Sequence, residues 1–241
     1  LFAVGPIAFT AGPIFAGLAA LTAFLCLRSR RAALGLGLED FWSLILAFFV
    51  GVGLGGAGFY YTLYGGGWSA NCAETLRRGG ALGGSFFGVF WGAAAAGFLF
   101  CRLRRIPFWP VADELAPAAF LGLSVMRIGC ILHGCCHGTA TSLPWAVVFT
   151  DPRCLVAPSL RGAPLHPVQL YEALGTLALF AFQRTVNNAR HAPGSSFLSG
   201  VALYGILRFG LDFIRAGERG LLAWGALSTT QVAALAGTAA A

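Results

Sequence analysis

The stretch RIGCILHGCCHG, residues 127–138, gathers side chains that can bind a metal, form a disulfide or bind an anion. It holds one arginine, three of the seven cysteines and two of the four histidines of the chain, namely Arg127, Cys130, His133, Cys135, Cys136 and His137. Thiolates and imidazoles are the ligands that zinc prefers, whereas cysteines in an oxidising compartment form disulfides. What the stretch does therefore depends on where it lies relative to a membrane.

The composition is that of an integral membrane protein. Of the 241 residues, 57% are hydrophobic and only 10% are charged, and the mean hydropathy is +0.75. A soluble domain carries about 25% charged residues, so this chain cannot cover a water-facing surface. The net charge of +7 does not indicate a nucleic-acid partner, because no soluble basic domain exists to carry it. We expect an all-α polytopic protein in which residues 1–241 form a single integral membrane domain.

Seven segments are apolar over about the 20 residues that a transmembrane helix needs. They are residues 7–27, 41–63, 80–101, 115–132, 168–186, 196–214 and 220–238. The first lacks a basic leading region, which predicts a retained span rather than a cleaved signal peptide. Arginines are denser near the span ends on one side, which places the N-terminus outside and the C-terminus in the cytoplasm. The proline- and glycine-containing segment 133–167 is then an irregular extracytoplasmic segment.

Ionisable residues inside three of these spans predict a functional site, since each costs about 2.5–3.5 kcal/mol to insert. Arg208 and Asp212 have i,i+4 spacing and lie on one helical stripe with Tyr204 and Arg215. They form either a structural ion pair or an anion site in which Asp212 orients the guanidinium. Glu172 is either a helix-start anchor or a buried carboxylate that needs Arg127 or Arg208 as partner. Together these side chains suit an amphiphile whose phosphate contacts the arginines.

The cysteines and histidines of residues 127–138 leave three interpretations open. The first is a metal site, for which four residues have suitable donors: Cys130, His133, Cys135 and His137. Adjacent cysteines rarely ligate one ion together, which weighs against it. The second is a disulfide from Cys135 or Cys136 to Cys154 or Cys72. The third is a polar lining of a lipid cleft without metal or redox chemistry, and we expect neither a metal nor a cofactor.

Several motifs in order resemble the bacterial prolipoprotein diacylglyceryl transferase family. They are RIGCILHGCCHG at 127–138, PWAVVF at 144–149, HPVQLYEA at 166–173 and LYGILRFGLDFIR at 203–215. The resemblance implies a multi-pass protein of the bacterial inner (plasma) membrane. It also implies transfer of diacylglyceryl from phosphatidylglycerol to the lipobox cysteine of a preprolipoprotein. The alternatives are a paralogue that acts on another acceptor, and a non-catalytic lipid-binding or thiol- or metal-handling membrane protein.

The resemblance further implies roles for individual residues. Arg127 and Arg208 correspond to arginines that contact the lipid phosphate. Other residues on family motif positions are Asp113, Gly129, Gly134, Gly138, His166, Gln169, Tyr171, Glu172, Tyr204 and Asp212. The family's signature asparagines and glutamate read here as Cys130, His133 and Cys135, and its third-span histidine or tyrosine reads as Leu82. The base that deprotonates the acceptor thiol would then be His133, His137 or His166.

Overall fold

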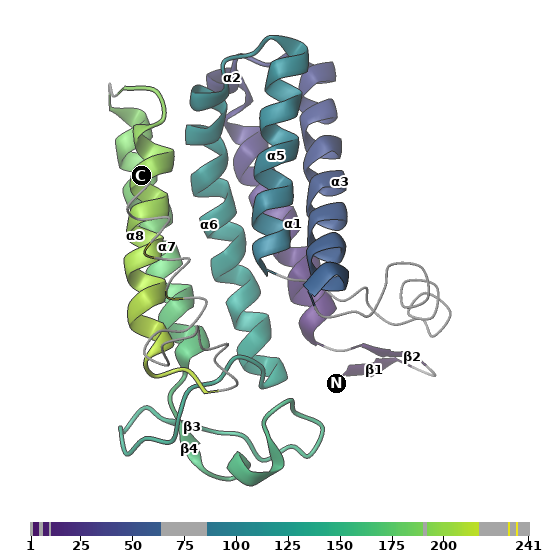
Figure 1. Ribbon diagram of the computed structural model, residues 1–241. Coiled ribbons are helices and arrows are strands. Elements are labelled where there is room, and N and C mark those ends of the chain that lie inside the picture. The colour runs from purple at the N-terminus through teal and green to yellow at the C-terminus, as the bar shows by residue number, and fades with distance from the viewer. Residues whose placement is uncertain are drawn as a thin grey trace. The chain divides into compact units, whose positions relative to one another are not determined.

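The computed structural model describes residues 2–4, 7–9, 11–63, 86–189, 192–216, 231 and 235, and within them the chain is mostly helical (Figure 1). In chain order its elements are β1 (Phe2–Val4), β2 (Ile7–Phe9), α1 (Ala11–Ser29), α2 (Arg31–Leu34), α3 (Leu38–Leu63), α5 (Phe86–Arg104), α6 (Phe108–His133), β3 (Val147–Val148), the 3-10 turn η1 (Pro158–Leu160), β4 (Pro164–Leu165), α7 (Val168–Asn188) and α8 (Ser195–Asp212). The expected helical class is confirmed in its main part, and two short antiparallel two-stranded sheets, β1–β2 and β3–β4, add to it.

The helix boundaries differ from the expected spans at two places. Residues 7–9 pair with β1 as a strand, so α1 begins at Ala11 rather than at residue 7. Helix α6 begins at Phe108 rather than at residue 115, because Asp113 and Glu114 are paired inside it and do not end it. The seventh expected span, 220–238, and residues 80–85 of the third lie outside the described residues, apart from Gln231 and Leu235.

Three of the described helices are long and apolar enough to cross a membrane, namely Ala11–Ser29, Leu38–Gly58 and Phe108–His133. Large apolar side chains on α3 are strongly exposed, with Leu46, Phe49 and Leu54 at 65%, 64% and 66%. Apolar surface of this kind suits contact with lipid rather than with water. The prediction of a membrane protein agrees with these features.

The described chain divides into two compact units, of which residues Arg31–Val111 form one. In this unit α3 and α5 pack through glycines, because a methyl group at Gly92 would collide with the backbone of Gly51 and Gly55. Small residues of this kind let membrane helices approach closely. Gly51 and Gly55 thus provide the close contact of α3 with α5.

Substituting Gly92 with alanine is expected to destabilise the protein by about 1–3 kcal/mol, since the added methyl group overpacks the contact between α3 and α5. Gly97→Ala is the matched control on the same helix, because its methyl group would meet only Phe48, at 3.9 Å. Both substitutions raise the helix propensity by the same amount, so the difference in stability between the two variants reports the packing of residue 92 against α3. Thermal unfolding in detergent measures it, and equal midpoints for the two variants would contradict this packing account.

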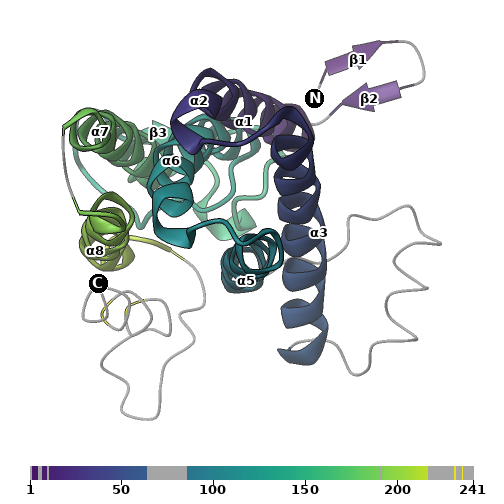
Figure 2. The ribbon, with the colours of Figure 1, turned by 90° about the horizontal axis from the view of Figure 1, so that it is seen from above.

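The other unit comprises Leu1–Arg30 and Ala112–Ala241 and includes α1, α7, α8 and nearly all of α6. Figures 1 and 2 show α7 and α8 side by side. At the N-terminal end of α6, Asp113 accepts hydrogen bonds from the backbone N–H groups of Gly194 (2.7 Å) and Phe197 (2.8 Å), which caps α8. Glu114 pairs with Arg30 at 2.9 Å. The carboxylates at this end of α6 therefore have structural partners.

The opposite end of α6 leads into the segment 133–167, which is irregular as expected apart from β3, β4 and η1. After α6 the chain pairs with the residues that follow α8, since Thr139 N–H donates to Ile214 O (2.8 Å) and Ala216 N–H donates to His137 O (3.1 Å). Gly138 N–H donates to His166 O at 2.9 Å, and a side chain at Gly138 would collide with His166. The RIGCILHGCCHG stretch thus meets the start of α7 and the end of α8.

Candidate active site

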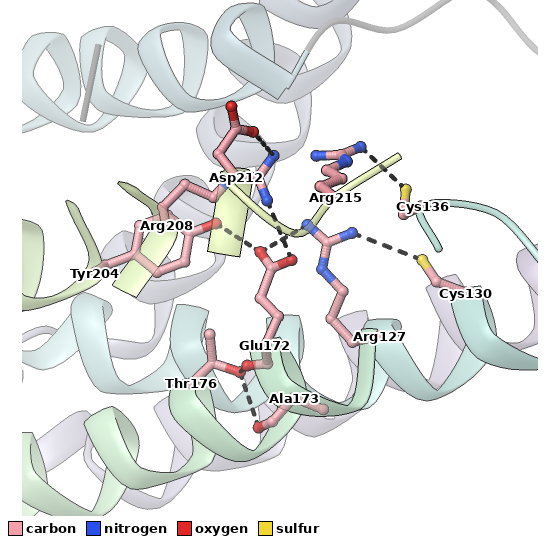
Figure 3. Close-up of polar contacts among 10 residues, drawn as sticks. All are labelled: Arg127, Cys130, Cys136, Glu172, Ala173, Thr176, Tyr204, Arg208, Asp212 and Arg215. Atoms are coloured by element: carbon pink, nitrogen blue, oxygen red, sulfur yellow. Dashed lines mark hydrogen bonds and ion pairs between the residues drawn. The ribbon is translucent and has the colours of Figure 1, made fainter. Parts of the chain in front are cut away.

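Glu172, in the second turn of α7, is the centre of a buried polar cluster. It is 1% exposed, and its Oε1 accepts hydrogen bonds from Arg127 Nη2 and from the Tyr204 hydroxyl, each at 2.9 Å. Its Oε2 lies 3.6 Å from Nη1 of Arg208. One carboxylate therefore joins α6, α7 and α8 (Figure 3). The prediction that Arg127 or Arg208 would be its partner is confirmed for both.

Arg208 and Asp212 form the ion pair that their spacing predicts. Nη2 of Arg208 lies 3.8 Å from Oδ1 of Asp212, and both residues are buried. Tyr204, one turn earlier on α8, directs its hydroxyl toward Glu172 (Figure 3). Asp212 thus holds Arg208 from one side while Glu172 holds it from the other.

Both arginines retain buried donors for a further acceptor. Arg127 Nε and Arg208 Nη1 form no hydrogen bond with any residue that the structure describes. A buried polar group without a hydrogen bond is costly, and phosphate or carboxylate oxygens are the acceptors that guanidinium groups bind most strongly. The arrangement can therefore bind an anion between α6, α7 and α8.

Local contacts bring α6 close enough to α7 for Arg127 to reach Glu172. The hydroxyl of Ser124, almost one turn before Arg127, donates to the carbonyl of Ala173 at 2.9 Å. The hydroxyl of Thr176 donates to the backbone carbonyl of Glu172 at 2.8 Å, so this hydroxyl is satisfied within α7 itself. Small side chains at these positions leave room for the two helices to approach.

A group of thiols lies beside this cluster. The sulfur atoms of Cys130, Cys135 and Cys136 lie within 4.8 Å of one another. Arg127 Nη1 lies 3.9 Å from Cys130 Sγ, and Arg215 Nη2 lies 3.4 Å from Cys136 Sγ (Figure 3). Hydrogen bonds from the neighbouring thiols lower the pKa of Cys136, and the charge of Arg215 lowers it further.

This grouping differs from the candidate metal ligands that the spacing suggested. His133 and His137, which the spacing suggested, are outside the thiol group, and Cys136 replaces them. The reason is the backbone, because Cys136 adopts φ of 60° and so directs its thiol to the same side as that of its neighbour. The alternative of a disulfide to Cys154 is not realised, since Cys135, Cys136 and Cys154 are free thiols. Cys72, its other suggested partner, lies outside the described residues.

The three candidate histidines have different surroundings. His137 Nδ1 lies 3.0 Å from the carbonyl oxygen of Gly138. His166 packs edge-on against the ring of Tyr171, and its buried Nδ1 has no hydrogen-bond partner among the described residues. His133 ends α6, and its carbonyl accepts a hydrogen bond from Leu155 N–H at 3.1 Å. The backbone hydrogen bonds between residues 138–139 and His166 place His137 and His166 on neighbouring, paired segments of the chain.

The remaining motif residues mostly shape the backbone around the site. Gly129 lies against Phe15 of α1, and Gly134 has φ of +76°, a conformation that favours glycine. Gln169 donates to the carbonyl of Cys135 at 2.7 Å, which ties α7 to the thiol turn. Tyr171 accepts a hydrogen bond from Trp145 Nε1 at 2.7 Å.

The sequence did not reveal the place of Cys136 in this site. The spacing of Arg215 put it on one stripe with Tyr204, Arg208 and Asp212, but its contact with Cys136 Sγ could not be read from that spacing. No local pattern reveals the left-handed conformation of Cys136. Leu82, where the family has a histidine or tyrosine, lies outside the described residues.

Fold and site together define a helical membrane protein with a cluster of arginines and carboxylates buried between three of its helices. The family model for prolipoprotein diacylglyceryl transferase matches residues 1–241. The chain therefore belongs to the prolipoprotein diacylglyceryl transferase family, a family of polytopic membrane transferases, and the resemblance seen in its motifs is confirmed.

Individual relatives agree with this assignment. Proteins named phosphatidylglycerol–prolipoprotein diacylglyceryl transferase are similar to the chain in Geobacter sulfurreducens (34% identical, over 80% of this chain and 72% of the relative) and Aromatoleum aromaticum (35%, over 90% and 84%). The protein of that name in Solidesulfovibrio magneticus is 40% identical over 64% of this chain. The chain matches 57% of the length of that relative.

Proposed function

We propose that this chain transfers the diacylglyceryl group of phosphatidylglycerol to the lipobox cysteine of a preprolipoprotein, in the plasma membrane of a bacterium. The observation that carries the proposal is the pair of buried arginines around Glu172, in which Arg127 Nε has no hydrogen-bond partner among the described residues and Arg208 Nη1 has only an ion pair with Glu172. Family membership supports the reaction, and the names of the relatives support the donor and the acceptor. The reaction is a substitution and needs no cofactor.

The proposed topology follows from the same assignment. Residues 1–241 act as a single integral membrane domain with about seven spans, the N-terminus outside and the C-terminus in the cytoplasm. The segment 133–167 then lies on the outer side, next to the arginine cluster at the C-terminal end of α6. A preprolipoprotein that presents its lipobox cysteine at the outer surface can reach the site from there.

In the proposed reaction Arg127 and Arg208 bind the phosphate of phosphatidylglycerol. The acceptor sulfur forms a bond to the glyceryl carbon that carries the phosphate, and the bond from that carbon to the phosphate oxygen breaks. Glycerol phosphate leaves with the electron pair, and the arginines stabilise its added negative charge. The acyl chains lie among apolar helix faces, and the proton of the acceptor thiol passes to a base.

The carboxylates act on the arginines rather than on the substrate. Both oxygens of Glu172 face guanidinium groups, and Asp212 holds Arg208 from the far side. Tyr204 completes the cluster by donating to Glu172. The proposed lipid-binding set also includes Tyr171 and the glycines that shape the site, Gly129, Gly134 and Gly138.

Among the three histidines, His137 suits the role of base best. If its Nδ1–H donates to the Gly138 carbonyl, 3.0 Å away, Nε2 is left unprotonated and can accept a proton. His166 has a buried Nδ1, and no hydrogen bond or ion pair with another described residue holds the ring of His133. We therefore assign proton removal to His137.

Replacing His137 with glutamine is expected to slow the transfer by about 10²–10⁴-fold at neutral pH, the usual contribution of a positioned base. His133→Gln serves as the matched control and should retain most activity. The initial rate of glycerol phosphate release from phosphatidylglycerol, with a lipobox peptide as acceptor, gives both values. Wild-type rates for His137→Gln would show that another group takes the proton.

Complementation tests the proposed function in the cell. The wild-type gene should rescue a bacterial strain depleted of its own transferase, and the Arg127→Ala variant should not. Failure of the wild-type chain to rescue, despite normal amounts in the membrane, would favour a paralogue with another acceptor or a non-catalytic lipid-binding protein.

A further inference from the structure

The thiol group of Cys130, Cys135 and Cys136 takes no part in the proposed transfer reaction. Its three sulfur atoms, all within 4.8 Å of one another, converge on one point instead of pointing into separate packing sites. Metal–sulfur bonds of about 2.3 Å place the sulfur atoms of a closed site roughly 4 Å apart. Small side-chain rotations would bring all three sulfurs to one ion.

The backbone around these cysteines is fixed in the geometry that brings the thiols together. Cys135 N–H donates to the carbonyl of Cys130 at 3.2 Å, and Gln169 donates to the carbonyl of Cys135 at 2.7 Å. Gly134 has φ of +76° and Cys136 has φ of 60°, which is uncommon for a residue with a side chain. Adjacent cysteines rarely ligate one ion together, but in this turn the thiols of Cys135 and Cys136 both lie near Cys130, in the last turn of α6.

The guanidinium groups near Cys130 and Cys136 favour the thiolate forms of these two residues. Arg127 contributes a guanidinium nitrogen 3.9 Å from Cys130 Sγ, and Arg215 contributes one 3.4 Å from Cys136 Sγ. Neighbouring cations stabilise the deprotonated form of a thiol. Among the described residues no histidine or carboxylate joins the three sulfurs in the group, so the donor set is entirely soft.

We infer that Cys130, Cys135 and Cys136 form a binding site for a soft, thiophilic cation, and that monovalent copper is the ion it takes. Thiolate ligands select Cu(I) over hard cations, and three of them satisfy a three-coordinate Cu(I) ion. A structural zinc site prefers four ligands, one more than this group supplies. Three thiolates around Cu(I) carry two negative charges, which the two arginines offset. Binding releases thiol protons and oxidises nothing, and it does not depend on the transferase activity.

The test is a copper titration of the full-length protein in detergent. Protein reduced with a phosphine is titrated under nitrogen with Cu(I) held by the chromogenic chelator bicinchoninate. Wild-type protein should take one more equivalent of Cu(I) than the triple variant with serine at all three cysteines. Each single serine variant should bind that ion more than about 100-fold less tightly, since even lost outer-shell partners weaken metal sites 10–100-fold. Cys154→Ser, a free thiol outside the group, should bind like the wild type.

A second measurement needs no substitution and so does not depend on the folding of variants. One equivalent of Cu(I) should protect Cys130, Cys135 and Cys136 of the wild-type protein from alkylation by N-ethylmaleimide, as located by peptide mass spectrometry. Equal copper uptake by the wild type and the triple variant would overturn the inference. Unchanged alkylation of the three thiols in the presence of copper would overturn it as well.

Discussion

The Arg127→Ala variant is expected to lose at least about 10²–10³-fold of the transfer rate. This is the effect of removing one donor that stabilises a developing oxyanion, and Arg127 is also a partner of Glu172. The residue is 9% exposed, so water cannot easily take the place of the lost guanidinium group at the phosphate. The rate of thioether formation on a lipobox peptide, measured in detergent with phosphatidylglycerol, gives the effect directly.

One further variant separates the geometry of the Arg127 guanidinium from its charge, and another serves as a control. Arg127→Lys keeps the positive charge but loses the planar fork that binds phosphate oxygens, so an intermediate rate is expected. Arg153→Ala removes an arginine that pairs with Asp151 at the surface, and its rate should equal that of the wild type. Full activity of Arg127→Ala would contradict the role of this arginine in phosphate binding.

The Glu172→Gln variant is expected to be the least stable of the single substitutions considered. It leaves two buried arginines without their shared counter-charge, and breaking a buried ion pair by removing one partner costs about 3–5 kcal/mol. The amide keeps the size of the side chain and one acceptor, so the loss reflects charge rather than a cavity. Thermal unfolding in detergent measures the change.

Asp151→Asn provides the control for Glu172→Gln. Asp151 pairs with Arg153 at the protein surface, where ion pairs contribute little to stability. Its unfolding temperature should match that of the wild type. A Glu172→Gln variant that unfolds at the wild-type temperature would mean that the arginines have other compensating charges.

The helical architecture and the composition of the arginine cluster were predictable from local patterns. Hydrophobic length indicated the helices, and the i,i+4 spacing indicated the pairing of Arg208 with Asp212. Charge complementarity restricted the partners of Glu172 to two arginines, and it contacts both. These features depend on helix periodicity and on the cost of isolated charges in a membrane, which a single sequence reveals.

Other features depend on tertiary contacts that no local pattern contains. The left-handed backbone of Cys136 groups three thiols where the spacing suggested a mixed cysteine and histidine site. Strand pairing at residues 7–9 shortens the first expected span. The capping of α8 by Asp113 joins residues far apart in the chain, and this contact explains a buried carboxylate whose partner the sequence did not identify.

Mass spectrometry of a lipobox peptide, after incubation with the purified protein and phosphatidylglycerol, tests the central claim most directly. We expect a peptide whose cysteine carries one diacylglyceryl group in thioether linkage, one glycerol phosphate released per modified peptide, and at least about 100-fold slower product formation by Arg127→Ala. An unmodified peptide, in the presence of folded wild-type protein and both substrates, would contradict it.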